Sequence, residues 1–497
     1  MRTWPPRSGT ADAILLPACR YRQHRQPRVR RQSTIGMTEL SVMRAFSHPH
    51  RRFRLPVAGT AAIFCLALLG GQVRAASLFT DEERARIVAF WNEPGRFQST
   101  LPLYPPGDGP WQVRLTPEGS RWFLAYQRAI GGSAAPPTMD APGSTPRSAV
   151  WEKWVQTRLE ADRWSARATA DAANAALQLP PVAAGTSPPP PPPGPIPPDL
   201  LATVGNPPVL ARAVTPLLHT VAFEDGEAYP LQDHVAVRPR YAYYRFPQGV
   251  MALGPQLRTL PESELDALFQ ACGFSPSEQR VAKAVSRHEG GFESINTYDT
   301  GYVSVGFIQF ASLEAGKGSL SAVLLHQKRT RPEEFERDFR RYGLDVDESG
   351  TQVCVDPGTG AELAGPVAIS RIVDDRRLIA VFQRAGRRSQ AFRVAQLQIA
   401  KLRYWPGDDP VRLLAGGQEH TGKVSDVIRS EAGLATLFDR KVNRGSIAPF
   451  PEVVARVMET HGLSSLAAAG AYEREIIAAL KYREDFLANA ELGQPTP

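Results

Sequence analysis

The carboxyl group of Glu289 lies at a point where helical sequence gives way to glycine. Ser275 and Glu278 have the spacing of a capping box, so they predict a helix that starts at Pro276. Two glycines, at positions 290–291, predict the end of that helix directly after Glu289. The negative end of the helix dipole and partial burial both favour a protonated carboxyl group there. Glu289 therefore has the position expected of a general acid.

A second polar group follows in the expected turn of a β-hairpin. Residues 295–310 are mostly β-branched or aromatic, and they are interrupted by an Asp-Thr-Gly turn that begins at Asp299. The carboxylate of Asp299 could face Glu289 across a groove. Cleavage of a glycosidic bond requires an acid for the leaving oxygen and often a second carboxylate or a positioned water. The pair therefore indicates glycoside chemistry, with the nearby Glu293 as a competing acid.

The motif as a whole resembles the lysozyme-like superfamily. In phage-type lysozymes a helix ends in Glu-Gly, an Asp-Thr pair follows, and a Gly-Tyr-x-Thr-x-Gly strand comes next. This chain has Glu289-Gly290, Asp299-Thr300 and then GYVSVG at residues 301–306. The chain also resembles goose-type lysozymes and soluble lytic transglycosylases, whose strand ends in Gly-x-x-Gln, because residues 306–309 read GFIQ. Ser304 stands where the phage family usually has Thr, and the Gly-x-Gly-His ending of that family is absent.

This resemblance implies a role for each matching side chain. Glu289 would be the acid, Asp299 or Ser304 would be the second group or hold the water, and Gln309 would be a sugar-binding amide. Residues 436–445 resemble a helix that shapes the cleft in several lysozyme-like enzymes. The expected substrate-binding residues are Tyr298, Tyr302, Gln309, Asp439 and Asn443.

The expected function is cleavage of the β-1,4 glycan strands of peptidoglycan, by hydrolysis or by lytic transglycosylation. A chitin-like polymer is the nearest chemical neighbour of that substrate. The alternative is a protein that keeps the fold and binds glycan in the cell envelope without turnover. No HExxH, paired CxxC, Walker A, dinucleotide-binding or GxSxG motif is present in the sequence, so neither a metal nor an organic cofactor is expected.

The net positive charge of the chain comes from its first 75 residues. The net charge of +8 and the isoelectric point of about 9.4 would by themselves favour a nucleic-acid or membrane partner. Residues 1–75, however, contain 13 arginines and only Asp12 and Glu39 as acidic residues, so the remainder is net negative. We therefore expect no nucleic-acid partner, and membrane contact only through the first segment.

That segment has the form of an export signal. Arginines precede an apolar run at residues 57–69, and small residues precede a cleavage site after Ala75. We expect a secretory signal peptide at residues 43–75 and a periplasmic or secreted mature protein. Residues 1–42 are expected to be disordered or to lie before the true start of translation.

The cysteines leave two possibilities open. Cys19 and Cys65 lie in the leader, and cleavage would leave Cys272 and Cys354. An even pair in an oxidising compartment can form a disulfide, which would tie the hairpin region to the start of the helix. The alternative is two separate buried thiols.

We expect an α+β fold that is predominantly helical, with a lysozyme-like C-terminal domain and a small β-hairpin. Capping signals at Thr80 and Thr116 and a long helical stretch from Arg147 indicate helices. A stripe of large apolar residues on the third helix predicts a core seam. The expected parts are a helical N-terminal module at 76–178, a Pro-rich linker at 179–199, a small β-containing segment at 200–258 and the lysozyme-like domain at 259–490.

Two further segments bear on binding. The linker contains six consecutive prolines, at 188–193, and is expected to form a stiff polyproline II spacer. A single long helix is expected at 374–404, and its row of basic side chains could meet an anionic glycopeptide or form a solvated face. Tyrosine-rich alternation at 241–246 could stack on sugar rings, although sheet packing is the commoner role of such a strand.

Overall fold

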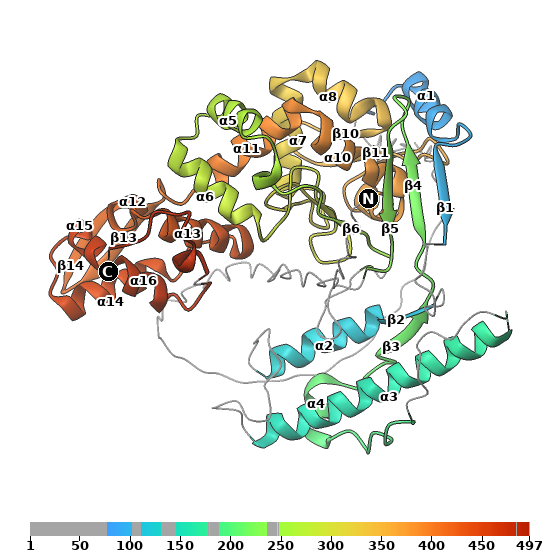
Figure 1. Cartoon of the computed structure of the whole chain (residues 1–497), viewed down its shortest axis with the longest axis horizontal. Coiled ribbons are helices and arrows are strands. Elements are labelled where there is room, and N and C mark those ends of the chain that lie inside the picture. The colour runs from blue at the N-terminus through green and yellow to red at the C-terminus, as the bar shows by residue number, and fades with distance from the viewer. Residues whose placement is uncertain are drawn as a thin grey trace, which may run out of the picture. The chain divides into compact units, whose positions relative to one another are not determined.

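The computed structural model describes residues 77–101, 111–130, 146–176, 178, 188–235, 246, 248–483 and 485–496. The chain is mixed α and β with helices predominant, as the sequence predicts (Figure 1). The expected signal peptide and the tyrosine-rich alternation at 241–246, apart from Phe246, lie outside the described residues. None of the described helices is both long enough and apolar enough to cross a membrane.

The first two helices begin where their capping residues predict, and the third begins one residue before the expected Arg147. The three helices are α1 (Asp81–Trp91), α2 (Pro117–Ala129) and α3 (Pro146–Ala176). Helix α1 has a complete capping box between Thr80 and Glu83. The apolar stripe of α3 forms part of a separate core cluster with α2, in which Val155 is fully buried. The interpretation of that stripe as core packing is therefore confirmed.

The expected helical module also contains two strands that the sequence did not predict. Strand β1 (Phe97–Thr100) pairs with β4 (Leu218–Ala222), and β2 (Gln112–Leu115) pairs with β3 (Ala211–Val214), both antiparallel. Strand β5 (Ala228–Gln232) completes the sheet β1-β4-β5. These pairings join residues 76–178 to residues 200–258, so the two expected segments share their sheets.

The described end of the expected linker packs against α3 instead of standing free as a spacer. The indole Nε1 of Trp154 donates to the carbonyl oxygen of Gly194 over 2.8 Å. Ile196 packs against the core cluster of α2 and α3, and helix α4 (Pro198–Val204) begins inside the expected linker. Residues 179–187 of the linker lie outside the described residues.

The expected hairpin is part of a four-stranded antiparallel sheet. Helices α5 (Glu262–Ala271) and α6 (Pro276–Ser286) precede it, and α6 has the predicted capping box of Ser275 and Glu278. The strands, in the order in which they pair, are β6 (Met251–Ala252), β7 (Ile295–Asn296), β8 (Ser304–Val305) and β9 (Phe310–Ala311). The hairpin between β7 and β8, with its turn at 299–301, is thus confirmed.

The long helix expected at 374–404 is two helices. Helix α10 (Arg376–Arg388) ends before Ser389, and α11 (Gln390–Tyr404) begins after it. The backbone of Ser389 is extended, and its hydroxyl accepts from the amide of Phe392. Ser389 is therefore the N-cap of α11 and does not lie inside one continuous helix. The remaining elements between the hairpin and these helices are α7 (Ser319–Thr330), α8 (Pro332–Asp338), η2 (Arg340–Tyr342), β10 (Leu344–Val346), β11 (Gln352–Val355), β12 (Glu362–Ala364) and α9 (Pro366–Asp374).

The C-terminal part is helical, apart from one hairpin that the sequence did not predict. That hairpin pairs β13 (Pro410–Ala415) with β14 (Gln418–Lys423). The helix expected around residues 436–445 is α13 (Glu431–Arg444), which stops at a left-handed Gly445. The other elements are α12 (Val424–Val427), α14 (Phe450–His461), α15 (Leu466–Ala469), η3 (Gly470–Tyr472), α16 (Glu473–Ala479) and η4 (Asp485–Ala488).

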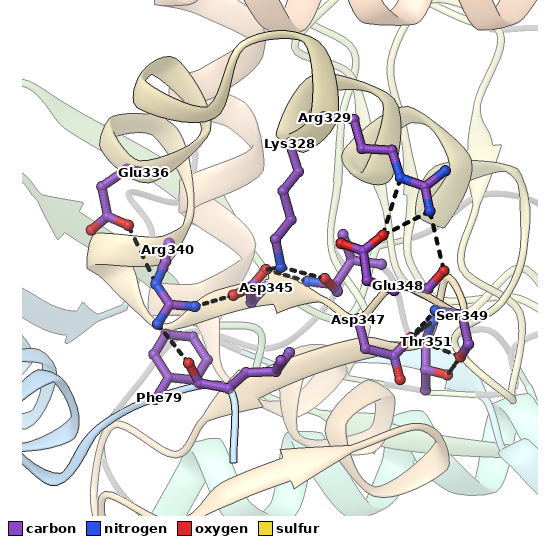
Figure 2. A network of polar contacts seen from close by, with 12 residues as sticks. Phe79, Lys328, Arg329, Glu336, Arg340, Asp345, Asp347, Glu348, Ser349 and Thr351 are labelled. Carbon is purple, nitrogen blue, oxygen red and sulfur yellow. Dashed lines mark hydrogen bonds and ion pairs between the residues drawn. The ribbon is translucent and has the colours of Figure 1, made fainter. Parts of the chain in front are cut away.

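Ion pairs of Arg340 connect the start of the described chain to η2 and β10. Arg340 pairs with Glu336 and with Asp345 of β10, whose side chain is fully buried (Figure 2). It also pairs with Glu83 at the start of α1. Its guanidinium also lies over the ring of Phe79, 4.6 Å from the centroid. Residues from α1 to the last helices share one large apolar core. Helix α1 therefore belongs to the same core as the region expected to be lysozyme-like.

Candidate functional site

Glu289 lies in the turn that follows α6, and its side chain is buried, with 3% of the residue exposed. Helix α6 ends at Ser286, three residues before Glu289 and not directly after it as expected, and the turn that follows depends on glycine for space. Gly290 has a φ of +118°, and a Cβ there would lie 2.0 Å from the hydroxyl of Ser294. A Cβ on Gly291 would lie 1.9 Å from the carbonyl oxygen of Pro255. The two glycines therefore let the chain turn tightly and place Glu289 inside the fold.

The carboxylate of Glu289 is oriented by a residue from a distant helix. Nδ2 of Asn443, on α13, donates to Oε1 of Glu289 over 3.2 Å and to the carbonyl oxygen of Asp439 over 3.0 Å. Arg483 interacts electrostatically with the charge of Glu289. Burial lowers the pKa of Arg483, but Asp439, Tyr482 and Glu289 together raise the pKa above its usual value. Asn443, which was expected to bind substrate, thus contacts the expected acid.

The competing acid, Glu293, has a different environment. Its carboxylate accepts from Nε of Arg387 at 2.5 Å and from Nη2 of Arg387 at 3.2 Å, and only 4% of the residue is exposed. A Cβ on Gly254 would lie 2.3 Å from Cγ of Glu293, so the side chain is also tightly packed. Arg387 therefore occupies both carboxylate oxygens of Glu293. Of the two neighbouring glutamates, Glu289 is the better candidate acid.

Asp299 shapes the hairpin turn from within. Its Oδ1 accepts from the amide of Gly301 at 2.8 Å, and its Oδ2 accepts from Nδ2 of Asn296 at 3.0 Å. Burial raises the pKa of Asp299 above its ordinary value, although these two hydrogen bonds act in the opposite direction. The sequence placed Asp299 in the turn but missed Asn296, whose only signal is its position three residues earlier.

Ser304 and Asp299 both lie close to Gly301. A Cβ on Gly301 would lie 2.4 Å from Oγ of Ser304 and 3.1 Å from Oδ1 of Asp299. Ser304 is 1% exposed, and within the described part of the chain its hydroxyl oxygen has no hydrogen-bond partner. A buried hydroxyl without a partner costs free energy unless a water or a ligand atom satisfies it. The Ser304 hydroxyl is therefore a group that a water or a ligand atom could still bond.

Three expected substrate-binding residues are engaged within the fold. Nε2 of Gln309 donates to the carbonyl oxygen of Gly306 over 3.1 Å, and the backbone of Gln309 is left-handed, with a φ of +55°. The ring of Tyr302 packs edge-on against Phe246, at a centroid separation of 5.1 Å. Tyr298 is buried in the core cluster of α2 and α3. These contacts show local packing roles for the three side chains.

Asp439 anchors the C-terminal segment. It is fully buried, and its carboxylate accepts from Arg483 at 3.1 Å and from the hydroxyl of Tyr482. Burial raises the pKa of Asp439, whereas Arg483 and Tyr482 act to lower it. The charges of both Asp439 and Glu289 act on Arg483. No sequence signal pointed to Arg483.

His288 packs beside this segment. Its Nε2 lies 2.8 Å from a carboxylate oxygen of Asp485, and its ring meets Phe486 edge-on. Burial, with a smaller effect from Arg483, lowers the pKa of His288 below its usual value. His288 thus packs between the candidate acid and the C-terminal segment.

The remaining expectations concern charge and sulfur. An anionic glycopeptide was expected to meet basic side chains at 374–404 that included Arg403. Five others of that set form ion pairs with acidic residues of the chain, namely Arg384, Arg387, Arg388, Arg393 and Lys401. Cys272 and Cys354 are free thiols, so the second of the two possibilities holds. The sulfur of Cys272 contacts the carbonyl oxygen of Val394, and that of Cys354 contacts the carbonyl oxygen of Ala368. In the described residues, no three or more His, Cys, Asp or Glu side chains are grouped so that they could hold a metal ion.

Comparison of the chain with protein-family models, with curated proteins and with solved structures found no match.

Proposed function

We propose that the protein is an exported glycosidase that cleaves the β-1,4 glycan strands of peptidoglycan, with Glu289 as general acid. The observation that carries this proposal is the placement of Glu289, which is buried in the turn after α6 with its carboxyl group oriented by Nδ2 of Asn443. In the neighbouring buried Glu293, Arg387 contacts both carboxylate oxygens. A positioned carboxyl group is what general acid catalysis requires.

The chemistry begins with transfer of the Glu289 proton to the glycosidic oxygen. The bond from that oxygen to the anomeric carbon then breaks, and the leaving sugar departs as an alcohol. In hydrolysis a water adds its oxygen to the anomeric carbon and returns a proton to Glu289. In lytic transglycosylation a hydroxyl of the same sugar attacks the anomeric carbon instead and gives its proton to Glu289, so no water is consumed.

Asp299 and Ser304 are proposed to hold the attacking group. The two side chains converge on Gly301, and Ser304 has an unsatisfied hydroxyl there. Asp299 already accepts two hydrogen bonds within its turn, which suits a residue that positions a water better than one that forms a covalent bond to sugar. Asp299 and Ser304 would thus act together on the attacking group.

Zymography on gels that contain purified cell walls tests the assignment of the acid. The wild-type protein is expected to clear the gel, and Glu289→Gln is expected to lose clearing by a factor of about 100 or more, because general acid catalysis contributes that much. Glu293→Gln is the matched control, since it removes a neighbouring buried carboxylate and should keep clearing. Equal loss in both variants would contradict the assignment.

A glycan-binding scaffold of the cell envelope is the second candidate function. It is favoured by the burial of Glu289, Asp299 and Ser304, which are each no more than 6% exposed. A scaffold would sediment with insoluble peptidoglycan and release no product. Mass spectrometry of the soluble fraction separates all three cases, because anhydro and reducing ends differ by one water and a scaffold yields neither.

We also propose that the protein is exported and that its reaction needs no cofactor. The leader at 43–75 would direct the protein to the periplasm or the medium, where peptidoglycan is the partner, and nucleic acid is not proposed as one. The residues proposed for catalysis include a carboxylic acid and a site for water, which are sufficient for glycosidic cleavage.

A further inference from the structure

A second group of polar side chains lies on the sheet β1-β4-β5, outside the candidate site. The hydroxyl of Ser99, on β1, is 2.8 Å from Nδ1 of His219, on β4. Nε2 of the same imidazole is 2.9 Å from Oδ2 of Asp233, which directly follows β5. The three strands lie side by side in this order (Figure 1). Three residues far apart in the sequence thus form one hydrogen-bonded line across a sheet.

The register explains why these side chains meet. Ser99 and His219 are directly opposite each other in the antiparallel pair of β1 and β4. His219 is likewise opposite Leu231, and Asp233 lies two residues beyond Leu231, on the same face of the sheet. Side chains on one face of adjacent strands are neighbours. Each of the three residues therefore has its position set by backbone pairing and not by a flexible loop alone.

The three residues differ in exposure as nucleophilic catalysis requires, because the nucleophile must reach the substrate while the groups behind it can be buried. Ser99 is exposed, whereas His219 is 8% exposed and Asp233 is 6% exposed. Asp233 also accepts from the amide of Leu217 at 2.7 Å, which fixes its carboxylate. Burial acts to raise the pKa of Asp233, but the hydrogen bonds from His219 and Leu217 lower the pKa below its ordinary value. Asp233 is therefore an ionised acceptor for His219.

The tautomer of His219 follows from these partners. A carboxylate can only accept, so Nε2 of the neutral imidazole carries the proton and donates it to Asp233. Nδ1 is then free to accept the proton of the Ser99 hydroxyl. A nucleophile, a base and a group that orients the base are the parts of an activated serine. The ring nitrogens are exchanged relative to the serine proteases, but the path of the proton is equivalent.

The strand also supplies a donor for a developing oxyanion. The carbonyl oxygen of Arg96 accepts from the amide of Ala222, whereas the amide of Arg96 donates to the carbonyl oxygen of Glu93. Residues whose backbone groups face the neighbouring strand alternate along an antiparallel strand with residues whose groups face away, so the amide of Ser99, three residues after Arg96, points away from β4. Strand β1 is the edge of its sheet. The Ser99 amide is thus directed outward beside its own hydroxyl, as in the oxyanion hole of serine hydrolases.

We propose that Ser99, His219 and Asp233 form a second catalytic centre, which hydrolyses carboxylic esters that have a short acyl group. Phe97 stacks on His219, with ring centroids 5.9 Å apart, and is 39% exposed, so it offers a small apolar surface beside Ser99. An exposed strand with one aromatic side chain suits a short acyl group better than a long one.

The reaction balances without a further co-reactant. Oγ of Ser99 forms a bond to the ester carbonyl carbon while its proton passes to Nδ1 of His219. The bond to the alkoxy oxygen then breaks, and His219 returns the proton to the leaving alcohol. Water repeats the sequence on the acyl-serine, with His219 again as base, and releases the carboxylic acid and free Ser99.

A fluorophosphonate probe and p-nitrophenyl acetate test the proposal on the full chain. The probe is expected to phosphonylate Ser99, as peptide mass spectrometry would show, and p-nitrophenyl acetate is expected to be hydrolysed. Ser99→Ala should abolish the label and lower hydrolysis by about 100-fold or more, because a positioned nucleophile and base contribute at least that much. Ser99 is exposed, so this variant is expected to fold. Thr100→Ala, which removes the next hydroxyl on β1, is the matched control and should retain both signals.

Two results would overturn this inference. One is the absence of label on Ser99 in wild-type protein with native circular dichroism. The other is equal labelling of Ser99 in His219→Gln, since the base would then have no role. The Glu289→Gln variant should label like wild type, so the outcome does not depend on the glycosidase proposal.

Discussion

At the scale of single residues, the same side-chain type has different roles because its partners differ. Glu289 and Glu293 are both buried, yet one contacts an amide and the other a guanidinium. Asp299 closes a turn with backbone and amide donors, whereas Asp439 is held by Arg483. Residue type and spacing therefore restrict the candidates, and the chemistry of each depends on contacts from distant elements.

The Glu293 ion pair is expected to support stability and not activity. Glu293→Gln removes the charged partner of Arg387, whose side chain is 46% exposed and can be solvated instead. We expect a loss of about 2 kcal/mol in the free energy of unfolding, which is typical of a hydrogen bond to a charged group. Urea unfolding measures this loss. An unchanged unfolding midpoint would show that the pair contributes nothing.

Asp299 is expected to make stability depend on pH. Because burial raises its pKa in the folded state, the protonated form is favoured by folding. This contribution is fully present below the unfolded pKa, about 3.9, and is lost as pH rises through the higher folded pKa. Asn does not titrate, so the stability of Asp299→Asn relative to wild type should rise with pH.

Urea unfolding of both proteins at about pH 4 and pH 7 measures this difference. Other carboxyl groups titrate alike in the two proteins and cancel. A relative stability that is constant, or that falls with pH, would contradict a raised pKa for Asp299.

At the scale of elements, the candidate site depends on how α6 stops. The capping box starts α6 at a defined residue, and two glycines let the chain return to β7 directly after Glu289. Ser294 fills the space that a side chain at Gly290 would need, and its hydroxyl accepts from the amide of Gly291 over 2.7 Å. The helix end, the turn and the hairpin are therefore one packed unit.

Gly290→Ala is expected to destabilise this unit by more than about 3 kcal/mol, because backbone strain is added to a steric clash. Its φ of +118° disfavours any side chain, and the new Cβ would lie 2.0 Å from Ser294. Gly226→Ala is the control, since Gly226 has a φ of +80° and no atom within 4 Å of a new Cβ. That variant should lose about 1 kcal/mol. Thermal unfolding compares the two, and equal losses would exclude the clash as a cause.

At the scale of the whole molecule, the part that precedes the candidate site is integrated with it. Nε1 of Trp91 donates to the carbonyl oxygen of Tyr342 over 2.9 Å, and the amides of Leu78 and Phe79 donate to the carboxylate of Glu362. Strands β1 and β4 pair across the boundaries expected from the sequence. Truncation at those boundaries would expose core side chains and break sheets.

Arg340 is expected to hold α1 on the core. Arg340→Ala leaves Asp345, whose side chain is fully buried, with Lys328 as its remaining ion-pair partner (Figure 2). Loss of one partner of a buried pair typically costs about 3 kcal/mol. Amide hydrogen exchange in α1 should therefore become faster in this variant.

Arg341→Ala is the matched control for that measurement. Arg341 is the neighbouring residue, is 45% exposed in its side chain and pairs with Glu224, which is partly exposed. An exposed pair contributes about 0 to 1 kcal/mol, so little change is expected. Equal exchange of α1 in the two variants would contradict the role of Arg340.

Some features were determined by the sequence alone, because they depend on residues only a few positions apart. The caps of α1, α2 and α6 and the hairpin turn at 299–301 all arise from local side-chain to backbone hydrogen bonds and from glycine. The apolar stripe of α3 was likewise predicted from helical periodicity. The break at Ser389 was missed, because a continuous helical pattern conceals an N-cap within it.

Only the tertiary structure decided which polar groups meet. Arg387 reaches Glu293 across 94 positions, Asn443 reaches Glu289 across 154, and Ser99 reaches His219 across 120. Strand pairs such as β1 with β4 are equally non-local. Such contacts depend on the register and packing of whole elements, which no short stretch of sequence encodes. For this reason the sequence could propose an acid, whereas the fold was needed to separate Glu289 from Glu293 and to bring Ser99, His219 and Asp233 together.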